Sequence, residues 1–306
     1  MPEPRVFTLI LNTNRRVDTL ACLASLEAST YRSNTIVVLD NASTDGSPAA
    51  IRAAYPAVQV VALAENLGYA GNNNVGLALA LQQSADWVLV LNEDTVLAPD
   101  CVAQLVAAGE ADPRVGLAGP LIYHADEPQV IQSAGGVLDR QWRAMHLGQN
   151  VPDQGQFGAT RDVDWLSGCA LFVRRAVLEQ VGLIDASYFY FWEETEWCLR
   201  AARAGWRIRQ VPAAKLWHKG VQRSYQPRPS ITYYATRNRL HTLAKHHAPL
   251  RAWLSAGSEV ARTLASWSLR PRYRDKRAHR AALWQAVIDF ARGRMGPAPA
   301  AITRAP

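Results

Sequence analysis

Short apolar runs alternate with longer segments of helical spacing along the first part of the chain. Four runs rich in strand-forming residues predict β-strands: 6–11, 35–39, 58–63 and 87–91. Three segments between them repeat apolar side chains at helical spacing: 18–28, 48–55 and 75–83. Strands that alternate with helices in this way favour a parallel sheet with both faces covered. We therefore predict an α/β fold with a mostly parallel sheet and helices on both faces.

The alternation becomes less regular in the second part of the chain. A helix is expected up to about residue 111 and a strand over 115–123, before a polar stretch at 124–162 with few periodic signals. The later elements expected are a strand ending at 173, helices at 174–181 and 193–204, and a last strand at 207–211 before Pro212. Long irregular stretches in compact domains are more often functional than idle, so we expect 124–162 to contribute to specificity.

Polar residues follow three of the predicted strands. Asn12 and Thr13 follow the first strand, Asp40 ends the second, and Asn92-Glu93-Asp94 ends the fourth. The carboxyl ends of parallel strands share one edge of a sheet, where ligands bind in open α/β folds. Carboxylate oxygens suit Mg²⁺ or Mn²⁺, which is often shared with substrate phosphates. Solvated turns are the alternative, but three such strand ends together favour a site.

A second group of carboxylates, Glu193, Glu194 and Glu196, opens the helix predicted at 193–204. Negative charge in the first turn of a helix is favourable by itself. Glu196 can also pair with Arg200 one turn later, and for Glu196 we expect this ion pair. For Glu193 and Glu194 the residues alone leave a structural role and an acid–base role open.

Charge divides the chain into an acidic body and a basic end. Residues 1–227 hold 18 Lys/Arg and 23 Asp/Glu, whereas residues 228–306 hold 15 Lys/Arg and three Asp/Glu. An acidic body is not typical of a protein whose main site grips nucleic acid, so we expect no nucleic-acid partner. The apolar runs are too short for a spanning helix or a signal peptide, and the four cysteines form no C-x-x-C pair. We expect a cytoplasmic protein with free thiols.

Several motifs occur in order between residues 5 and 245. They are V-V-L-D-N-A-S-T-D-G-S, N-L-G-Y-A-G-N-N-N-V-G, L-V-L-N-E-D-T, W-L-S-G-C-A-L-F-V-R-R and F-W-E-E-T-E-W-C-L-R-A-A-R-A-G-W, followed by His218. Together they resemble the family 2 glycosyltransferases of the GT-A fold. The segment Y-Y-A-T-R-N-R at 233–239 further resembles the rhamnosyltransferase-like branch of that family.

The resemblance implies inverting transfer of a sugar from a nucleoside diphosphate donor to the hydroxyl of a glycan or lipid-linked acceptor. The implied donor is dTDP- or UDP-linked, with dTDP-rhamnose among the candidates, and the implied cofactor is Mg²⁺ or Mn²⁺. Asp40 would accept a hydrogen bond from the nucleobase. The other residues implied near the donor are Asn12, Thr13, Asn66, Gly71, Asn74, Asn92 and Glu93.

The resemblance also implies a metal site and a catalytic base. Asp94 and His218 would bind the metal, and Glu194 occupies the position of the base. Two departures from the family pattern matter. Asn92 replaces the first acid of the D-x-D motif, and an amide oxygen is a weaker ligand than a carboxylate. Glu194 replaces the more usual Asp, which lengthens the base by one methylene and leaves Glu193 as an alternative base.

The basic end of the chain predicts a separate helical arm. Apolar residues fall on helical stripes in two parts of 246–296, with an Arg-rich segment between them. Arg-rich amphipathic helices are typical of contacts with anionic membrane surfaces, here the inner face of the membrane; packing back onto the body is the alternative. We predict a catalytic domain at 1–245, a basic helical arm at 246–296 and a disordered tail at 297–306.

Two functions from different classes follow from these patterns. The first is a metal-dependent glycosyltransferase that builds a cell-envelope polysaccharide or glycolipid. The second is a catalytically silent protein that binds a nucleotide sugar or glycan within a polysaccharide assembly, which the two departures allow. A dinucleotide-binding dehydrogenase would require a G-x-G-x-x-G loop after the first strand, and the Asn12–Arg16 segment contains no glycine.

Overall fold

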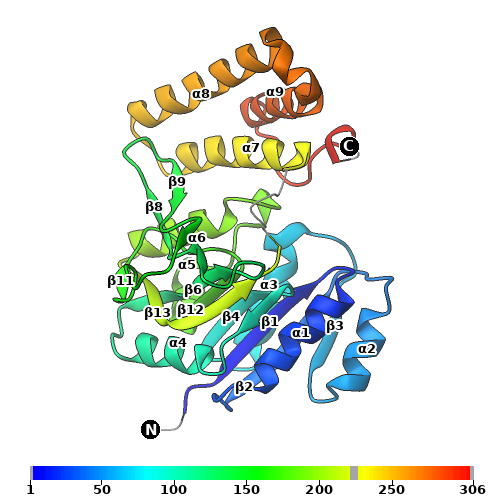
Figure 1. Ribbon diagram of the computed structural model, residues 1–306, viewed down its shortest axis with the longest axis vertical. Helices are drawn as coiled ribbons and strands as arrows, with labels where there is room; N and C mark the ends of the chain where they lie inside the picture. The colour runs from blue at the N-terminus through cyan, green and yellow to red at the C-terminus, as the bar shows by residue number, and fades with distance from the viewer. Residues whose placement is uncertain (1–2, 221–226, 304–306) are drawn as a thin grey trace.

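Four parallel strands form the centre of the sheet in the computed structural model, which describes residues 3–220 and 227–303 (Figure 1). In spatial order they are β3 (Gln59–Ala62), β2 (Asn34–Asp40), β1 (Val6–Asn12) and β4 (Trp87–Asn92). The predicted α/β fold with a mostly parallel central sheet is confirmed. The register places Asn12 beside Asp40 and Leu11 beside Asn92, so these strands end at one edge.

The centre of the sheet is buried on both faces because side chains alternate along each strand. In β4, Trp87, Leu89 and Leu91 face one core, and Val88 and Val90 face the other. One core is covered by α1 (Arg16–Glu27), α2 (Ser47–Ala54) and α4 (Cys101–Glu110). The other core is covered by α3 (Gly68–Gln82), α5 (Arg175–Val181) and α6 (Glu193–Arg203).

Beyond β4 the sheet becomes mixed. β12 (Ala170–Arg174) runs antiparallel to both β4 and β6 (Val115–His124). β13 (Arg207–His218) runs parallel to β6 and antiparallel to β5 (Thr95–Leu97). The last strand was predicted to end at 211, and this is wrong. Pro212 lies within a register shift between Val211 and Lys215, where the loss of one backbone donor is tolerated and the strand continues.

The stretch 124–162 was predicted to be irregular, but it contains short strands. They are β7 (Val130–Ser133), β8 (Gly136–Leu138), β9 (Ala144–His146), β10 (Val151–Pro152) and β11 (Arg161–Asp162). The β8–β9 hairpin extends from the sheet toward the C-terminal helices (Figure 1). There the guanidinium of Arg143 donates to Ser255 Oγ at 3.1 Å. These strands are too short and too polar to produce a periodic signal in the sequence.

A separate layer of helices lies beside the sheet, at the top of Figure 1. It contains α7 (Pro229–Lys245), α8 (Leu250–Leu269), the 3₁₀ helix η2 (Pro271–Lys276), α9 (Arg277–Ala291) and α10 (Ala300–Thr303). α7 packs extensively against α9, so this helical layer begins at residue 229, ahead of the arm expected at 246. A short 3₁₀ helix, η1 (Ala186–Tyr188), precedes α6 on the body.

The disordered tail predicted at 297–306 is wrong for residues 297–303. The Ala298 N–H donates to the Tyr234 hydroxyl at 2.7 Å, and Ile302 in α10 is buried against the layer. Two apolar residues within a short tail were enough to anchor it, because Tyr234 and its neighbours form a preformed apolar surface. Residues 304–306 of this prediction lie outside the described residues.

Candidate active site

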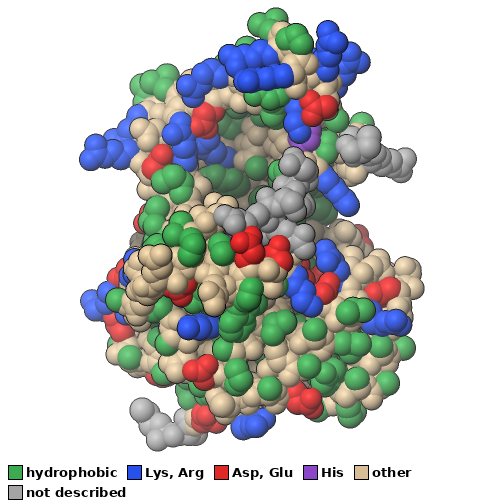
Figure 2. Space-filling view, viewed as in Figure 1, with side chains coloured by type: hydrophobic (Ala, Val, Ile, Leu, Met, Phe, Trp, Pro, Cys, Tyr) green, Lys and Arg blue, Asp and Glu red, His purple; other side chains and the backbone are tan. Residues whose placement is uncertain are grey.

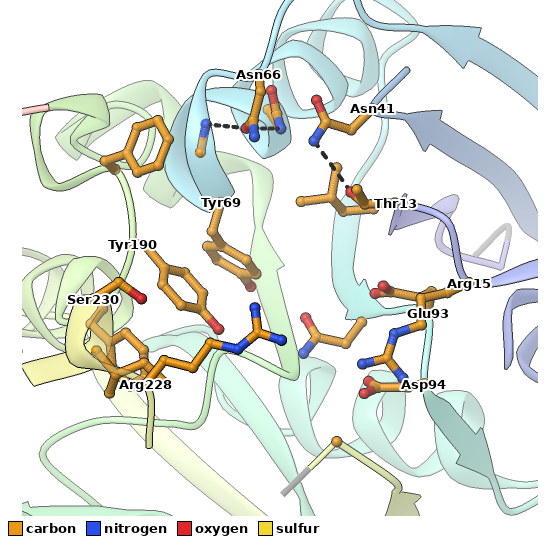
Figure 3. Close-up of a pocket in the computed structure, with 18 of the residues that line it drawn as sticks. Thr13, Arg15, Asn41, Asn66, Tyr69, Glu93, Asp94, Tyr190, Arg228 and Ser230 are labelled. Atoms are coloured by element: carbon orange, nitrogen blue, oxygen red, sulfur yellow. Dashed lines mark hydrogen bonds between the residues drawn. The ribbon is translucent and has the colours of Figure 1, made fainter. Parts of the chain in front are cut away.

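A cleft of ≈ 560 Å³ opens at the sheet edge where β1 and β4 end (Figure 3). Six of the residues singled out in the sequence line it: Thr13, Asn66, Asn92, Glu93, Asp94 and His218. Asn66 and the start of α3 form one wall together with residues 189–191, which pack against Gly68, and the start of α7 adds to it. The cleft therefore lies between the sheet and the helical layer, and both contribute side chains to it.

Asp94 and His218 come together because β5 pairs with β13. The pairing sets His218 opposite Thr95, and Asp94 Oδ1 lies 3.1 Å from His218 Nε2. His218 Nδ1 lies 2.9 Å from Gln132 Oε1, an acceptor, so Nδ1 carries a hydrogen. Nε2 then faces a carboxylate oxygen, an arrangement that requires a proton or a cation between the two atoms.

Two further observations show that this pair fits a metal ion. Asp94 Oδ1 is buried, and apart from His218 Nε2 no hydrogen-bond donor among the described residues reaches it. Glycine at position 220 leaves space beside the other oxygen, because a Cβ atom there would lie 2.3 Å from Asp94 Oδ2. No group of three or more His, Cys, Asp or Glu side chains is placed to hold a metal in residues 3–220 and 227–303. Asp94 and His218 are thus two candidate ligands for a metal ion.

Two neighbours of Asp94 set the charge at this end of the cleft. Burial, and after it the charge of Asp94, raises the pKa of Glu93 to about 7. Arg15, which sequence reasoning missed, reaches the same place from the loop after β1, and Figure 3 shows its side chain beside Glu93 and Asp94. Its position only three residues beyond Asn12, at the shared sheet edge, was the signal that would have identified it.

The residues expected at the nucleobase form a hydrogen-bonded network beneath the cleft. Asn12 is fully buried; its amide nitrogen donates to Asp40 Oδ1 at 2.6 Å and to Ser43 Oγ at 3.0 Å. Asp40 Oδ2 accepts from the Ser43 N–H at 3.1 Å. Neither Asn12 nor Asp40 lines the cleft, whereas Thr13 and Asn41 do, joined at 3.2 Å. Asn12 therefore supports the cleft from beneath rather than lining it, because neighbouring side chains use its hydrogen-bonding groups.

The N-L-G-Y-A-G-N-N-N-V-G motif also contains residues that line the cleft and residues that only support it. Asn66 lines the cleft and accepts from the Gly68 N–H at 2.9 Å. Asn74 instead bridges α3 to the backbone of Ile184, with contacts of 2.7 and 3.0 Å. Gly71 is buried, and a Cβ atom there would meet Leu67 Cβ at 2.5 Å. The structure therefore gives Gly71 and Asn74 packing functions away from the cleft.

Glu193 is buried and Glu194 is half-buried at the start of α6, and neither lines the cleft. Tyr69 lines the cleft, and its pKa is raised by burial and then by the charges of both glutamates. Tyr69 therefore links the two glutamates to the cleft. Burial also raises the pKa of the Cys169 thiol to about 12, and the nearby charges of Asp94 and Glu194 add to it. The charges of Asp94 and Glu194 thus both act on Cys169.

The two glutamates differ in their ionisation. Burial raises the pKa of Glu194 to about 7. Burial and the charge of Glu194 raise the pKa of Glu193 further, well above its ordinary value. One oxygen of each side chain is buried without a hydrogen-bond donor in the described part of the chain. Burial thus shifts both carboxyl groups toward the protonated form, and Glu193 is shifted further than Glu194.

Glu196 has the structural role that the sequence predicted. Its carboxylate lies 3.1 Å from the Arg200 guanidinium, 3.0 Å from Lys245 Nζ and 3.2 Å from His246 Nε2. Burial acts to raise its pKa, but these partners outweigh burial and lower it to about 2. Glu196 therefore joins α6 to the end of α7 as a permanently ionised carboxylate.

The wall formed by residues 188–192 is strained and held from the helical layer. Phe189, Phe191 and Trp192 have φ values of 67°, 69° and 74°, which non-glycine residues rarely adopt. The amide nitrogen of Asn238 lies 3.0, 2.8 and 2.7 Å from the carbonyl oxygens of Tyr188, Tyr190 and Phe191. These hydrogen bonds fix the strained loop immediately before Glu193 and Glu194.

Arg237 is fully buried and binds the same loop, and we call Asn238 and Arg237 together the clamp. Its guanidinium donates to the carbonyl oxygens of Tyr188 at 3.1 Å and Gly296 at 2.8 Å, and its Nε donates to Asn238 Oδ1 at 2.9 Å. Both clamp residues belong to the Y-Y-A-T-R-N-R segment. Sequence reasoning noted that segment without assigning it a function, because its partners lie elsewhere in the chain.

Comparison with known proteins agrees with this architecture. Residues 9–182 match the family Glycosyl transferase family 2. An N-acetylglucosaminyl-diphospho-decaprenol L-rhamnosyltransferase of Mycobacterium tuberculosis is 31% identical over 264 residues, 79% of this chain and 86% of the relative. A dTDP-rhamnosyl transferase, RfbF, of Shigella flexneri is 24% identical over 201 residues, 63% of this chain and 65% of the relative.

The solved structures support the fold. Mannosyltransferase PcManGT from Pyrobaculum calidifontis, in complex with GDP-Man and Mn²⁺, superposes with a TM-score of 0.60 at 20% identity. The match covers 95% of this chain and 88% of that protein. A GalNAc-T7 structure with UDP, GalNAc and Mn²⁺ gives a TM-score of 0.65 at 15% identity, over 95% of this chain and 58% of that one.

Proposed function

This chain belongs to glycosyl transferase family 2, and we propose that it transfers L-rhamnose from dTDP-rhamnose to the hydroxyl of a lipid-linked glycan, with inversion. The relatives support this choice, since one is named for dTDP-rhamnose and another for a decaprenol diphosphate acceptor. A UDP-linked donor is the nearest alternative. The observation that carries the proposal is the pair of separate carboxylate groups around one cleft, Asp94 in its wall and Glu194 beside Tyr69.

Asp94 and His218 would hold Mg²⁺ or Mn²⁺. Asp94 Oδ1 and His218 Nε2 face each other, and glycine at position 220 leaves space beside Asp94 Oδ2. When bound, such an ion offsets the negative charge that develops on a leaving diphosphate. Arg15, beside the same carboxylates, adds a permanent positive charge next to that position. Thr13, Asn41 and Asn66 offer hydrogen-bonding groups along the donor side of the cleft.

Glu194 would act as the base. The acceptor oxygen forms a bond to the anomeric carbon while the bond from that carbon to the donor diphosphate breaks, and the hydroxyl proton passes to Glu194. A base works best when its pKa lies near the working pH, and the pKa of Glu194 is about 7. The pKa of Glu193 is raised further, so Glu194 is the better of the two candidates.

A metal-dependence assay tests the donor half of this proposal. Transfer from dTDP-rhamnose to an N-acetylglucosaminyl diphosphate lipid should require added Mn²⁺ or Mg²⁺, and Asp94→Asn should abolish it while the protein remains folded by circular dichroism. Full activity in excess chelator would remove the metal from the proposal. If the folded wild-type protein binds the donor but transfers sugar to none of the acceptors tested, the catalytically silent binding protein is favoured instead.

We also propose that α8 and η2 contact an anionic membrane surface. Leu250, Leu254 and Leu269 on α8 are 72%, 65% and 80% exposed, and η2 adds Arg272 and Arg274, also exposed. No helix in residues 3–220 and 227–303 is long and apolar enough to cross a membrane. The protein should therefore co-float with vesicles containing anionic lipid and detach at high salt; equal binding to neutral vesicles would contradict this.

A further inference from the structure

A second cavity lies within the helical layer, separate from the cleft already described. Its volume is ≈ 310 Å³, and Figure 2 shows the surface hollowed among the C-terminal helices. Its walls come from α7, α8 and α9 and are mainly apolar, with Trp192, Leu240, Val260, Trp267 and Leu283 among them. We call this cavity the helical groove.

The helical groove begins where the cleft ends. Phe189, Tyr190 and Phe191 line the cleft, and the next residue, Trp192, lines the groove. On α7 the same change occurs between Ile231, which lines the cleft, and Thr232, which lines the groove. The cleft and the groove therefore adjoin at one loop and one turn of α7, which contribute to both walls.

Glu259 is the one carboxylate among the described residues that line the groove, and it is already paired. Glu259 forms ion pairs with both Arg143 and Arg239, which leaves no unbalanced carboxylate in the wall. A sugar chain would need free hydrogen-bonding groups along its length, whereas a hydrocarbon chain needs only apolar contact. The groove lining therefore favours a hydrocarbon occupant.

Positive charge marks the two ends of the groove. At the cleft end, Arg228 points into the cleft (Figure 3) and forms no ion pair with any described residue. At the far end the groove shares Thr263 and Trp267 with a shallower hollow that also contains Arg262 and Arg270. A guanidinium next to an apolar channel matches a ligand with an anionic head and a long apolar tail.

We propose that the helical groove binds the isoprenoid chain of the acceptor, with Arg228 facing the acceptor diphosphate. This rests on the proposed function, in which the acceptor hydroxyl enters the adjoining cleft and gives its proton to Glu194 beside Tyr69. The chain then leaves the protein at the hollow around Arg262 and Arg270, on the same helix whose exposed leucines face the proposed membrane surface. The helical layer is thus the part of the protein that recognises the lipid.

The test compares two acceptors without vesicles: N-acetylglucosaminyl diphosphate carrying a farnesyl chain or a methyl group. The wild-type protein should prefer the farnesyl acceptor in kcat/KM. Thr263→Trp, which fills the groove from α8, should reduce that preference by at least about tenfold, because each buried methylene adds to binding. Ser258→Trp, on the exposed side of the same helix, should leave the preference unchanged.

Thr236→Trp fills the groove from α7 and provides a second variant if the first does not fold. Loss of the preference in either folded variant supports the proposal, and an unchanged preference in a folded variant overturns it. Arg228→Gln should raise KM for both diphosphate acceptors but not for methyl N-acetylglucosaminide; equal effects on all three would overturn the assignment of Arg228. If wild-type protein transfers to no acceptor, the proposed function fails. If it transfers to both without preference, only the groove assignment fails.

Discussion

The two sides of the cleft are built by different means. The donor side follows from the sheet, because β1, β2 and β4 run parallel and in register, and residues just beyond their ends lie at one edge. The acceptor side depends on the helical layer, where Asn238 holds three carbonyl oxygens of a strained loop. The donor side is therefore specified locally, whereas the acceptor side is specified by contacts between distant segments.

The two sides of the cleft also differ in how their strained backbone angles are distributed. Asn12, Asp40 and Ser43 have ordinary backbone geometry, and beside them positive φ values of non-glycine residues occur singly, at Asn14 and Ala42, both 52°. On the acceptor side, the backbone of Phe189 also approaches Gly68 so closely that a Cβ there would lie 2.3 Å from the Phe189 carbonyl oxygen. Strain of this kind persists only when the surrounding structure enforces it, and the clamp supplies that enforcement.

The largest expected effect separates the two glutamates. Glu194→Gln should lower kcat by about 10²–10⁴-fold, because it removes the proton acceptor, while dTDP-rhamnose still binds. Glu193→Gln should change kcat far less, since burial and the charge of Glu194 already shift Glu193 further toward the protonated form. Steady-state kinetics with calorimetry of donor binding measures both. A larger loss in Glu193→Gln would reverse the assignment of the base.

A smaller effect is expected when the clamp is weakened. Asn238→Asp keeps the volume of the side chain and its contact with Arg237 but removes the N–H donors to the loop carbonyls. We expect a loss of about 1–3 kcal/mol in stability, a lower kcat and a higher acceptor KM, with donor KM unchanged.

Asn74→Asp is the matched control for the clamp, because Asn74 also bridges two segments through its side-chain amide. It should cost stability without selectively raising acceptor KM. Thermal melts and initial-rate kinetics of both variants give the comparison. If Asn238→Asp and Asn74→Asp change the kinetic constants alike, the prediction is contradicted. The loop at 188–192 would then not depend on the clamp for acceptor binding.

The smallest effect is a pH dependence that belongs to the acceptor side alone. Glu194 must be ionised to accept a proton, so kcat should fall about tenfold per unit below a pH of about 7 and level off above it. Because burial raises the folded-state pKa, the contribution of Glu194 to stability is present below its unfolded pKa and is lost as pH rises through about 7. Donor affinity measured over the same range should not show the Glu194 midpoint; a shared midpoint would contradict this separation.

The sequence by itself determined the central sheet and the polar residues gathered at the ends of β1 and β4. Alternating apolar strands and amphipathic helices permit few other packings, and the acids at the strand ends follow from the register of a parallel sheet. The sequence could not separate residues that line the cleft from those that support it. Asn12 and Thr13 are adjacent and both polar, but only the surrounding hydrogen-bond partners of Asn12 remove it from the cleft.

Tertiary structure decided the acceptor side. Asn238, Arg237 and the strained loop at 188–192 carry no local periodic signal, and their relation appears only when α7 packs beside the start of α6. The same holds for the groove, which exists because three helices leave space between apolar faces that the sequence shows only as stripes. Local patterns encode which face of an element is buried, but which buried faces meet is fixed by the packing of the whole chain.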